Sequence, residues 1–112
     1  MNGDGWIGVD LDGTLAEYDR WVGANHIGKP VPKMLERVKA WRAAGKQVRI
    51  FTARVAVPAP GVLRYIEDWC LEHIGEALPV TCAKDYGMVE LWDDRCVQVI
   101  PNTGERADGR AS

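Results

Sequence analysis

Two aspartates separated by one residue are the first sign of chemistry in this sequence. Asp10 and Asp12 directly follow a continuous apolar segment and precede a glycine and a threonine. Polar residues also follow three later apolar segments, as Thr52-Ala53-Arg54, Lys84-Asp85 and Asp93-Asp94-Arg95. In an open parallel sheet, ligands bind outside the carboxyl ends of the strands, so we expect these groups to meet at one edge.

Several carboxylates at one edge need a cation or protons. Two like charges roughly 4 Å apart repel by about 4 kcal/mol at an effective dielectric constant of about 20, and a bound cation or protonation relieves that repulsion. Oxygen ligands favour a hard cation, and a partly hydrated site suits Mg²⁺. The Thr52 hydroxyl and the Lys84 amine opposite the acids would hold an anion that bridges to the metal. This combination is typical of phosphoryl transfer.

The same residues resemble the motifs of a known family. Asp10-Leu11-Asp12-Gly13-Thr14-Leu15 matches the DxDGT(L/V) signature of the haloacid dehalogenase (HAD) superfamily. Three further segments resemble its second, third and fourth motifs: Ile50-Phe51-Thr52-Ala53-Arg54, Lys84 and Leu91-Trp92-Asp93-Asp94. The motifs occur in the family order and span residues 6–95, about four fifths of the chain.

The resemblance implies a Mg²⁺-dependent phosphomonoester hydrolase of the small capless type. Asp10 would attack a phosphate monoester and form an aspartyl-phosphate. Asp12 would protonate the leaving oxygen and then activate the water that cleaves the intermediate. An acid two residues after the nucleophile indicates a phosphatase or phosphotransferase, because the dehalogenase branch lacks that acid.

The resemblance also implies which residues hold the metal and the phosphate. Mg²⁺ would bind Asp10, the backbone carbonyl of Asp12, and Asp93 or Asp94, with Asp93 favoured because it is nearer the strand end. The transferring phosphoryl group would contact the side chains of Thr52 and Lys84 and the backbone N–H groups around Leu11 and Gly13.

An irregular loop beside the predicted site is a candidate substrate-binding segment. Residues 16–29 have no hydrophobic period, and in the HAD family this position forms a small flap. Tyr18, Arg20 and Trp21 are candidates to contact a leaving group. Arg54 either contacts substrate or pairs with a nearby aspartate.

The elements that position these residues alternate along the chain. Predicted strands cover residues 6–11, 48–51, 79–82, 88–92 and 96–100, and predicted helices cover 31–41 and 62–74. Alternation implies right-handed crossovers and a parallel sheet. We therefore expect an α/β fold, and the resemblance implies a three-layer Rossmann-like HAD core with a central, mainly parallel sheet and no cap domain. Residues 1–101 would form one catalytic domain, and residues 102–112 a loose tail.

Composition excludes some classes of function. The 112 residues are 46% hydrophobic with a net charge of −2, which argues against a general nucleic-acid coat or a polybasic membrane binder. The sequence shows no long apolar run and no secretory signal. Three cysteines without a CxxC pair favour a reducing cytoplasm over a disulfide framework.

Alternative functions remain open at this point. A non-catalytic phosphate- or metal-binding module could use the same scaffold, and Asp93-Asp94-Arg95 resembles phosphatases that act on polynucleotide ends. A zinc site is a weaker alternative, built from Cys70, His73, Cys82 and Cys96. The expected substrate is a small phosphorylated metabolite or nucleotide. An open site is compatible with a homodimer.

Overall fold

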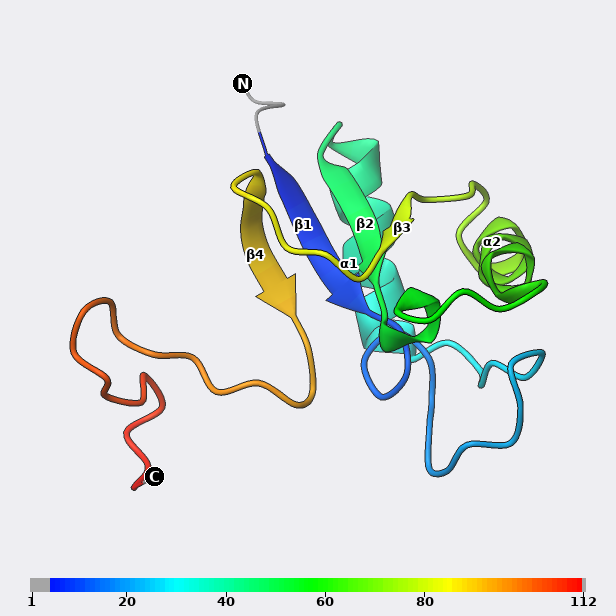
Figure 1. The fold of residues 1–112 in the computed structure, drawn as a ribbon. Helices are drawn as coiled ribbons and strands as arrows, with labels where there is room; N and C mark the ends of the chain where they lie inside the picture. Colours follow the sequence, from blue (N-terminus) through cyan, green and yellow to red (C-terminus); the bar gives the residue numbers. More distant parts are fainter. Residues whose placement is uncertain (1–4, 112) are drawn as a thin grey trace.

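The computed structural model describes residues 5–111 and contains a four-stranded, wholly parallel sheet (Figure 1). In chain order the elements are β1 (Trp6–Asp10), α1 (Pro32–Ala43), β2 (Gln47–Phe51), the short 3₁₀ helix η1 (Ala53–Val55), α2 (Val62–His73), β3 (Val80–Thr81) and β4 (Met88–Trp92). The strand order is β3-β2-β1-β4. The predicted α/β class and parallel sheet are confirmed.

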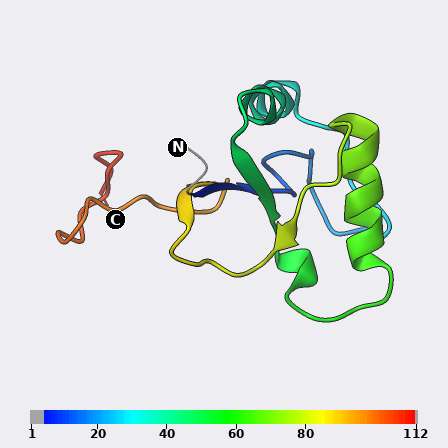
Figure 2. The same ribbon diagram turned by 90° about the horizontal axis from the view of Figure 1, so that it is seen from above.

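One face of the sheet carries the hydrophobic core. Side chains alternate along a strand, so Ile7 and Val9 of β1 share this face with Val48 and Ile50 of β2, and all four are buried. The two helices cover it with Met34, Val38, Ile66 and Trp69. Right-handed crossovers from β1 to β2 and from β2 to β3 move in one direction along the sheet, which places both helices on the same side (Figure 2).

The other face is covered by a loop instead of a helix. The connection from β3 to β4 returns across the sheet through residues 82–87, in front of the strands in Figure 1. Asp85 anchors this loop by accepting hydrogen bonds from Trp6 Nε1 and from the Gly87 backbone N–H, both at 2.8 Å. The Arg49 guanidinium lies 4.4 Å from the centroid of the Trp6 ring. Of the three expected layers, the helices form one, the sheet forms the second and this loop forms the third.

Both predicted helices are confirmed, and so is the irregular loop between β1 and α1. Helix α1 begins with proline in its first turn and ends before Gly45, whose φ of +82° suits a glycine after the last helical turn. Residues 17–29 contain no helix or strand. Within residues 5–111 no helix has the length and apolarity required to cross a membrane.

The predicted strand at residues 96–100 is wrong. An Asx turn, in which the Arg95 backbone N–H donates to Asp93 Oδ1 at 2.7 Å, directs the chain away from the sheet directly after β4. The segment then folds back on itself, and the Val99–Arg106 bridge is antiparallel. Its apolar residues therefore stay about half exposed, because no strand of the sheet lies beside them.

Candidate active site

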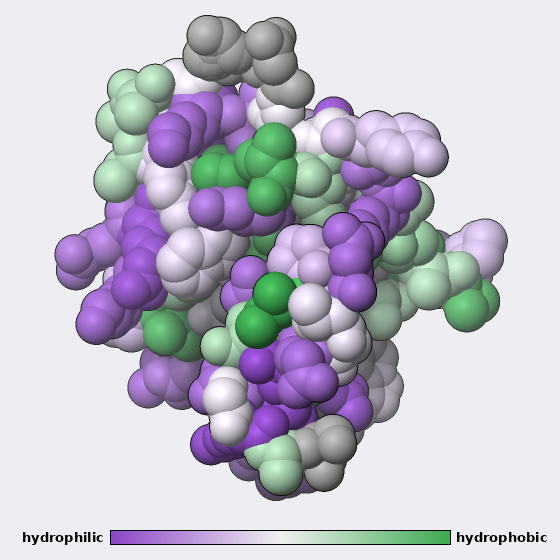
Figure 3. Space-filling model, turned by 90° about the vertical axis from the view of Figure 1, so that its left-hand side faces the viewer, coloured by the Kyte–Doolittle hydropathy of each residue, from purple (hydrophilic) through white to green (hydrophobic). Residues whose placement is uncertain are grey.

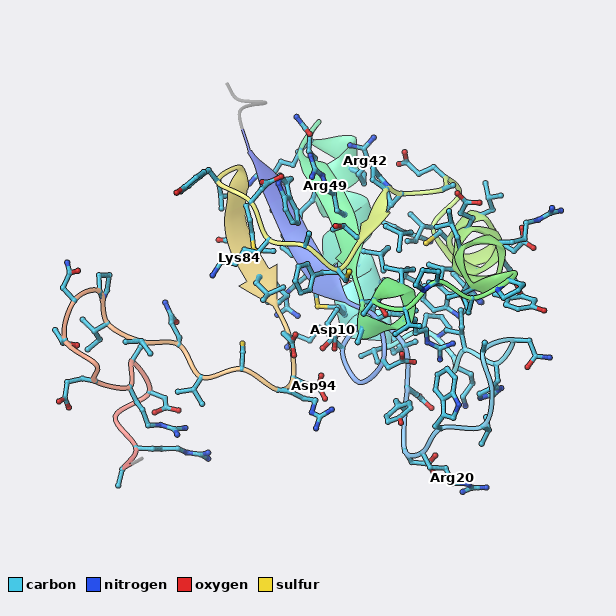
Figure 4. All side chains as sticks on the ribbon, viewed as in Figure 1. Asp10, Arg20, Arg42, Arg49, Lys84 and Asp94 are labelled. Carbon is cyan, nitrogen blue, oxygen red and sulfur yellow. The ribbon has the colours of Figure 1, made fainter. Side chains whose placement is uncertain are left out.

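Parallel strands bring three carboxylates together at one end of the sheet. Asp10 is the last residue of β1, and β4 pairs with β1 so that Val9 lies beside Trp92. Asp93 and Asp94 follow Trp92 and therefore reach the same place. Oxygen atoms of these three aspartates lie within 4.8 Å of one another. Figure 4 shows Asp10 and Asp94 at this end of the sheet, whereas Arg42 and Arg49 lie at the other.

The carboxylate cluster strongly perturbs Asp10. Burial is the largest cause that raises its pKa to about 7, followed by a hydrogen bond with Asp94 and by the charges of Asp93 and Asp94. Thr14 opposes the shift by donating a hydrogen bond. A divalent cation between the three aspartates would remove the same repulsion. The donor set consists of carboxylate oxygens, which fits Mg²⁺.

Thr14 is a site residue to which sequence reasoning gave no role. Its Oγ1 lies 3.4 Å from Asp10 Oδ2 and 3.4 Å from Asp94 Oδ1. A single hydroxyl therefore links the aspartate of β1 to one that follows β4. The sequence did contain an indication of this role, since Thr14 belongs to the same motif as Asp10 and Asp12.

Gly13 does not have the predicted role of phosphate donor. Its backbone N–H donates to the Ala16 carbonyl at 2.8 Å and is therefore not free to bind phosphate. Gly13 instead has a φ of +90°, and a Cβ atom here would overlap the Asp94 carboxylate. Its function in the structure is to let the turn after β1 approach Asp94. Leu11, the other residue predicted to offer a backbone N–H to phosphate, is fully buried.

Thr52 lies where the second motif predicts, at the end of β2 and beside the end of β1. Asp10 pairs with Phe51 in the sheet, so Thr52 follows the strand neighbour of Asp10. The Thr52 residue is only 2% exposed, and its Oγ1 accepts a hydrogen bond from the Arg54 backbone N–H at 3.1 Å. Its own O–H remains a donor towards a cavity of about 900 Å³ that Asp10, Asp12 and Asp94 also line.

Asp12 is separate from the carboxylate cluster because it pairs with Arg54. Arg54 Nε donates to Asp12 Oδ2 at 2.7 Å, and Arg54 Nη2 donates to Asp12 Oδ1 at 2.8 Å. The Arg54 side chain is 5% exposed and that of Asp12 is 20% exposed. Of the two roles considered for Arg54, the structure shows the pairing with an aspartate.

The flap, defined as residues 17–29, forms one side of the cavity. Tyr18 and Trp21 line both the site cavity and a neighbouring cavity of about 410 Å³, and each is about half exposed. Arg20 lines only the neighbouring cavity, and in Figure 4 it lies at the outer end of the flap.

Lys84 is not brought into the site. It is exposed on the loop between β3 and β4, and the site cavity is lined without it. Its neighbour Asp85 contacts Trp6 at the amino end of β1, opposite the aspartate cluster. Sequence reasoning placed both residues at a strand end, but β3 already ends at Thr81. The structure therefore places Lys84 away from the aspartates, and its contact with a phosphate stays a prediction.

The zinc alternative receives no support within residues 5–111. The one group of three or more metal-ligating side chains found there contains only aspartates. Cys70 is buried, whereas Cys82 and Cys96 are exposed, and all three are free thiols. Cys82 lines the site cavity, a position that the sequence did not indicate.

Comparisons with known proteins support the fold. No family model and no curated protein matches this chain. A solved structure of a conserved protein from Bacteroides thetaiotaomicron is similar, with a TM-score of 0.59 and 21% sequence identity. The match covers 87% of this chain and 81% of that one. At this level of identity the likeness shows a shared fold.

Proposed function

We propose that this protein is a Mg²⁺-dependent phosphomonoester hydrolase that works through an aspartyl-phosphate on Asp10. The observation that carries the proposal is the convergence of Asp10, Asp93 and Asp94 on a cavity that Thr52 and Asp12 also line. The first, second and fourth of the motifs that resemble the HAD superfamily support the same assignment, since Asp10, Thr52 and Asp94 all line this cavity.

The proposed reaction has two steps. A carboxylate oxygen of Asp10 attacks phosphorus, the bond to the leaving oxygen breaks, and Asp12 gives that oxygen a proton. Asp12 then takes a proton from water as the water oxygen attacks the aspartyl-phosphate. The bond between the Asp10 oxygen and phosphorus breaks, which releases inorganic phosphate and restores the Asp10 carboxylate and the protonated Asp12.

The other groups bind and orient the substrate. Asp10, Asp93 and Asp94 would hold Mg²⁺, which when bound supplies positive charge against the carboxylates and the phosphate. Thr52 would donate its O–H to a phosphate oxygen because its own oxygen already accepts from Arg54. The leaving group would extend past Asp12 towards Tyr18 and Trp21 of the flap.

The open cavity suits a small phosphorylated metabolite or nucleotide as substrate. A cavity of about 900 Å³ lies in the upper part of the range for small-molecule sites. The three free thiols are the basis for placing the protein in a reducing cytoplasm within this proposal.

The proposal is tested by phosphate release from p-nitrophenyl phosphate and a panel of metabolite phosphates, with and without Mg²⁺. Asp10→Asn should reduce the wild-type rate to background, because the amide is a poor nucleophile and a weak metal ligand. Asp68→Asn, at an exposed position on α2, is the matched control and should retain the wild-type rate.

The outcomes separate the alternatives. Activity that is absent with every substrate, or unchanged in Asp10→Asn, rules out the hydrolase. Absent activity together with Mg²⁺-dependent binding of beryllium fluoride, which mimics the aspartyl-phosphate, would favour the non-catalytic binding module. Activity confined to phosphorylated polynucleotide ends would favour the end-processing alternative.

A further inference from the structure

A single side chain, that of Arg54, contacts both the proposed acid–base residue and the flap. Its Nε and Nη2 donate to the two oxygens of Asp12. Its Nη1 donates to the Ala24 carbonyl at 3.2 Å, and Nη2 also donates to the His26 carbonyl at 2.9 Å. The Trp21 ring lies 4.8 Å from the guanidinium carbon. Arg54 comes from η1, directly after β2, so it joins three separate segments of the chain.

The contact with Asp12 fixes the orientation of the carboxylate. A guanidinium presents its N–H groups in a rigid planar fork, so two parallel bonds hold both carboxylate oxygens in its plane. Each carboxylate oxygen has two lone pairs, and the fork occupies one on each. The remaining lone pairs stay available towards the cavity, which Asp12 lines. Arg54 therefore orients Asp12 without blocking proton transfer.

The contacts with the flap hold a segment that has no secondary structure of its own. The flap is closed at its base, where the Glu17 backbone N–H donates to the Lys29 carbonyl at 2.8 Å. Arg54 binds two carbonyls nearer the middle of the segment, at Ala24 and His26. The Arg54 side chain is 5% exposed and the bond to Ala24 is partly buried, whereas the bond to His26 is exposed.

We propose that Arg54 is a positioning residue that holds the Asp12 carboxylate and the flap as one unit. This inference rests on the proposed phosphatase function and assigns Arg54 to the leaving-group side of the reaction. Protonation of the leaving oxygen then depends on Arg54, whereas attack by Asp10 and binding of the phosphoryl group do not. Arg54 is not a phosphate ligand in this arrangement, because the fork is occupied by Asp12.

Substrates with different leaving groups test this assignment. p-Nitrophenolate departs without a proton, whereas the alkoxide of an alkyl phosphate such as glycerol phosphate needs one. Arg54→Met should lower kcat for the alkyl phosphate by about 100-fold, which is the lower end of the range for acid–base catalysis. It should lower kcat for p-nitrophenyl phosphate by less than about 10-fold. Arg54→Lys should show the same selectivity, because it keeps the charge but loses the fork.

Controls separate positioning from other roles. Arg64→Met, at an exposed position on α2, should change neither rate. Equal losses with both substrates would overturn the proposal, since a phosphate ligand or a purely structural residue predicts that result. The proposal would also be overturned if Arg54→Lys had the same ratio of kcat values for the two substrates as the wild type.

A second measurement does not depend on activity. Hydrogen exchange at the amides of residues 17–29 should become faster in Arg54→Met and also in Asp12→Asn, while exchange in β1 and β2 stays unchanged. Asp12→Asn is informative because an amide offers the fork only one accepting oxygen. Unchanged exchange of the flap in Asp12→Asn would overturn the coupling. If the wild type hydrolyses none of the substrates, the phosphatase proposal fails, and the exchange data still decide whether Arg54 couples Asp12 to the flap.

Discussion

Asp10 has to satisfy two opposing demands. As the proposed nucleophile and metal ligand it would need to be ionised, yet burial and the neighbouring aspartates raise its pKa to about 7. The arrangement stores electrostatic repulsion that a divalent cation would relieve, so metal binding and ionisation of Asp10 are linked.

The pH dependence of stability should report this linkage. The pKa of Asp10 is raised on folding, so its contribution is fully present below about pH 4 and is lost as pH rises through about 7. We expect the Tm of the metal-free protein to fall over this interval, and Mg²⁺ to restore it most strongly above pH 7. Thermal melts with Mg²⁺ or EDTA measure both effects.

Asp10→Asn is the control for this pH dependence. It removes the titrating group, so the decline in Tm between about pH 4 and 7 should become shallower and stabilisation by Mg²⁺ should weaken. A steep decline retained in Asp10→Asn would assign the pH dependence to other groups.

A second residue-scale prediction concerns Gly13. Gly13→Ala should destabilise the fold by about 1–2 kcal/mol, because φ is positive there, and should also weaken Mg²⁺ binding, because its Cβ would displace Asp94. Gly45→Ala is a matched control, with a φ of +82° and no neighbouring atom within 4 Å of the added Cβ. Denaturation and Mg²⁺ titration of both variants should show similar losses of stability and a weaker Mg²⁺ affinity only in Gly13→Ala.

At the scale of elements, the sequence predicted the parts that depend on local pattern. Both helices and the strands β1, β2 and β4 follow from hydrophobic period and glycine position. Strand ends placed Asp10, Thr52 and Asp93 correctly, because parallel pairing determines where each strand ends relative to its neighbour.

The features that the sequence did not predict depend on tertiary contacts. Lys84 and Asp85 lie away from the site because Asp85 binds Trp6 across the sheet, at a separation of 79 residues. The hydrogen bond of Gly13 to Ala16 and the bidentate pairing of Arg54 with Asp12 likewise require the folded turn and the flap. The strand-like pattern at residues 96–100 does not form a strand of the sheet, because the chain turns away from the sheet before this segment.

The loop of residues 82–87 yields the prediction at this scale. Asp85→Ala leaves Trp6 Nε1 without its acceptor and should lower the Tm, whereas Asp85→Asn retains an accepting oxygen and should lower it less. Hydrogen bonds from Trp6 and Gly87 are the main causes that lower the pKa of Asp85, so its stabilisation is present above pH 4 and fades on acidification. Melts at pH 7 and pH 3 test this, and equal Tm losses in both variants at pH 7 would contradict it.

At the scale of the whole molecule, the segment after β4 stands apart from the sheet. Residues 96–111 extend away from it in Figure 1, and none of their side chains belongs to the core cluster. Figure 3 views the side that carries β4 and this segment, and its apolar patches are separated by hydrophilic ones. Val89 of β4 and Val97 of the segment are both at least half exposed.

A chain that ends at Cys96 should therefore keep both its stability and its proposed activity. Among residues 97–111, every hydrogen bond that the structure shows connects residues within that segment, so deletion should shift Tm by less than about 2 °C. Melting and phosphate release compare the shortened and full-length proteins, and light scattering compares their masses. A large fall in Tm would show that the segment packs on the sheet. A change from the mass of a dimer to that of a monomer after deletion would show that the segment joins two copies, and would assign it to a homodimer.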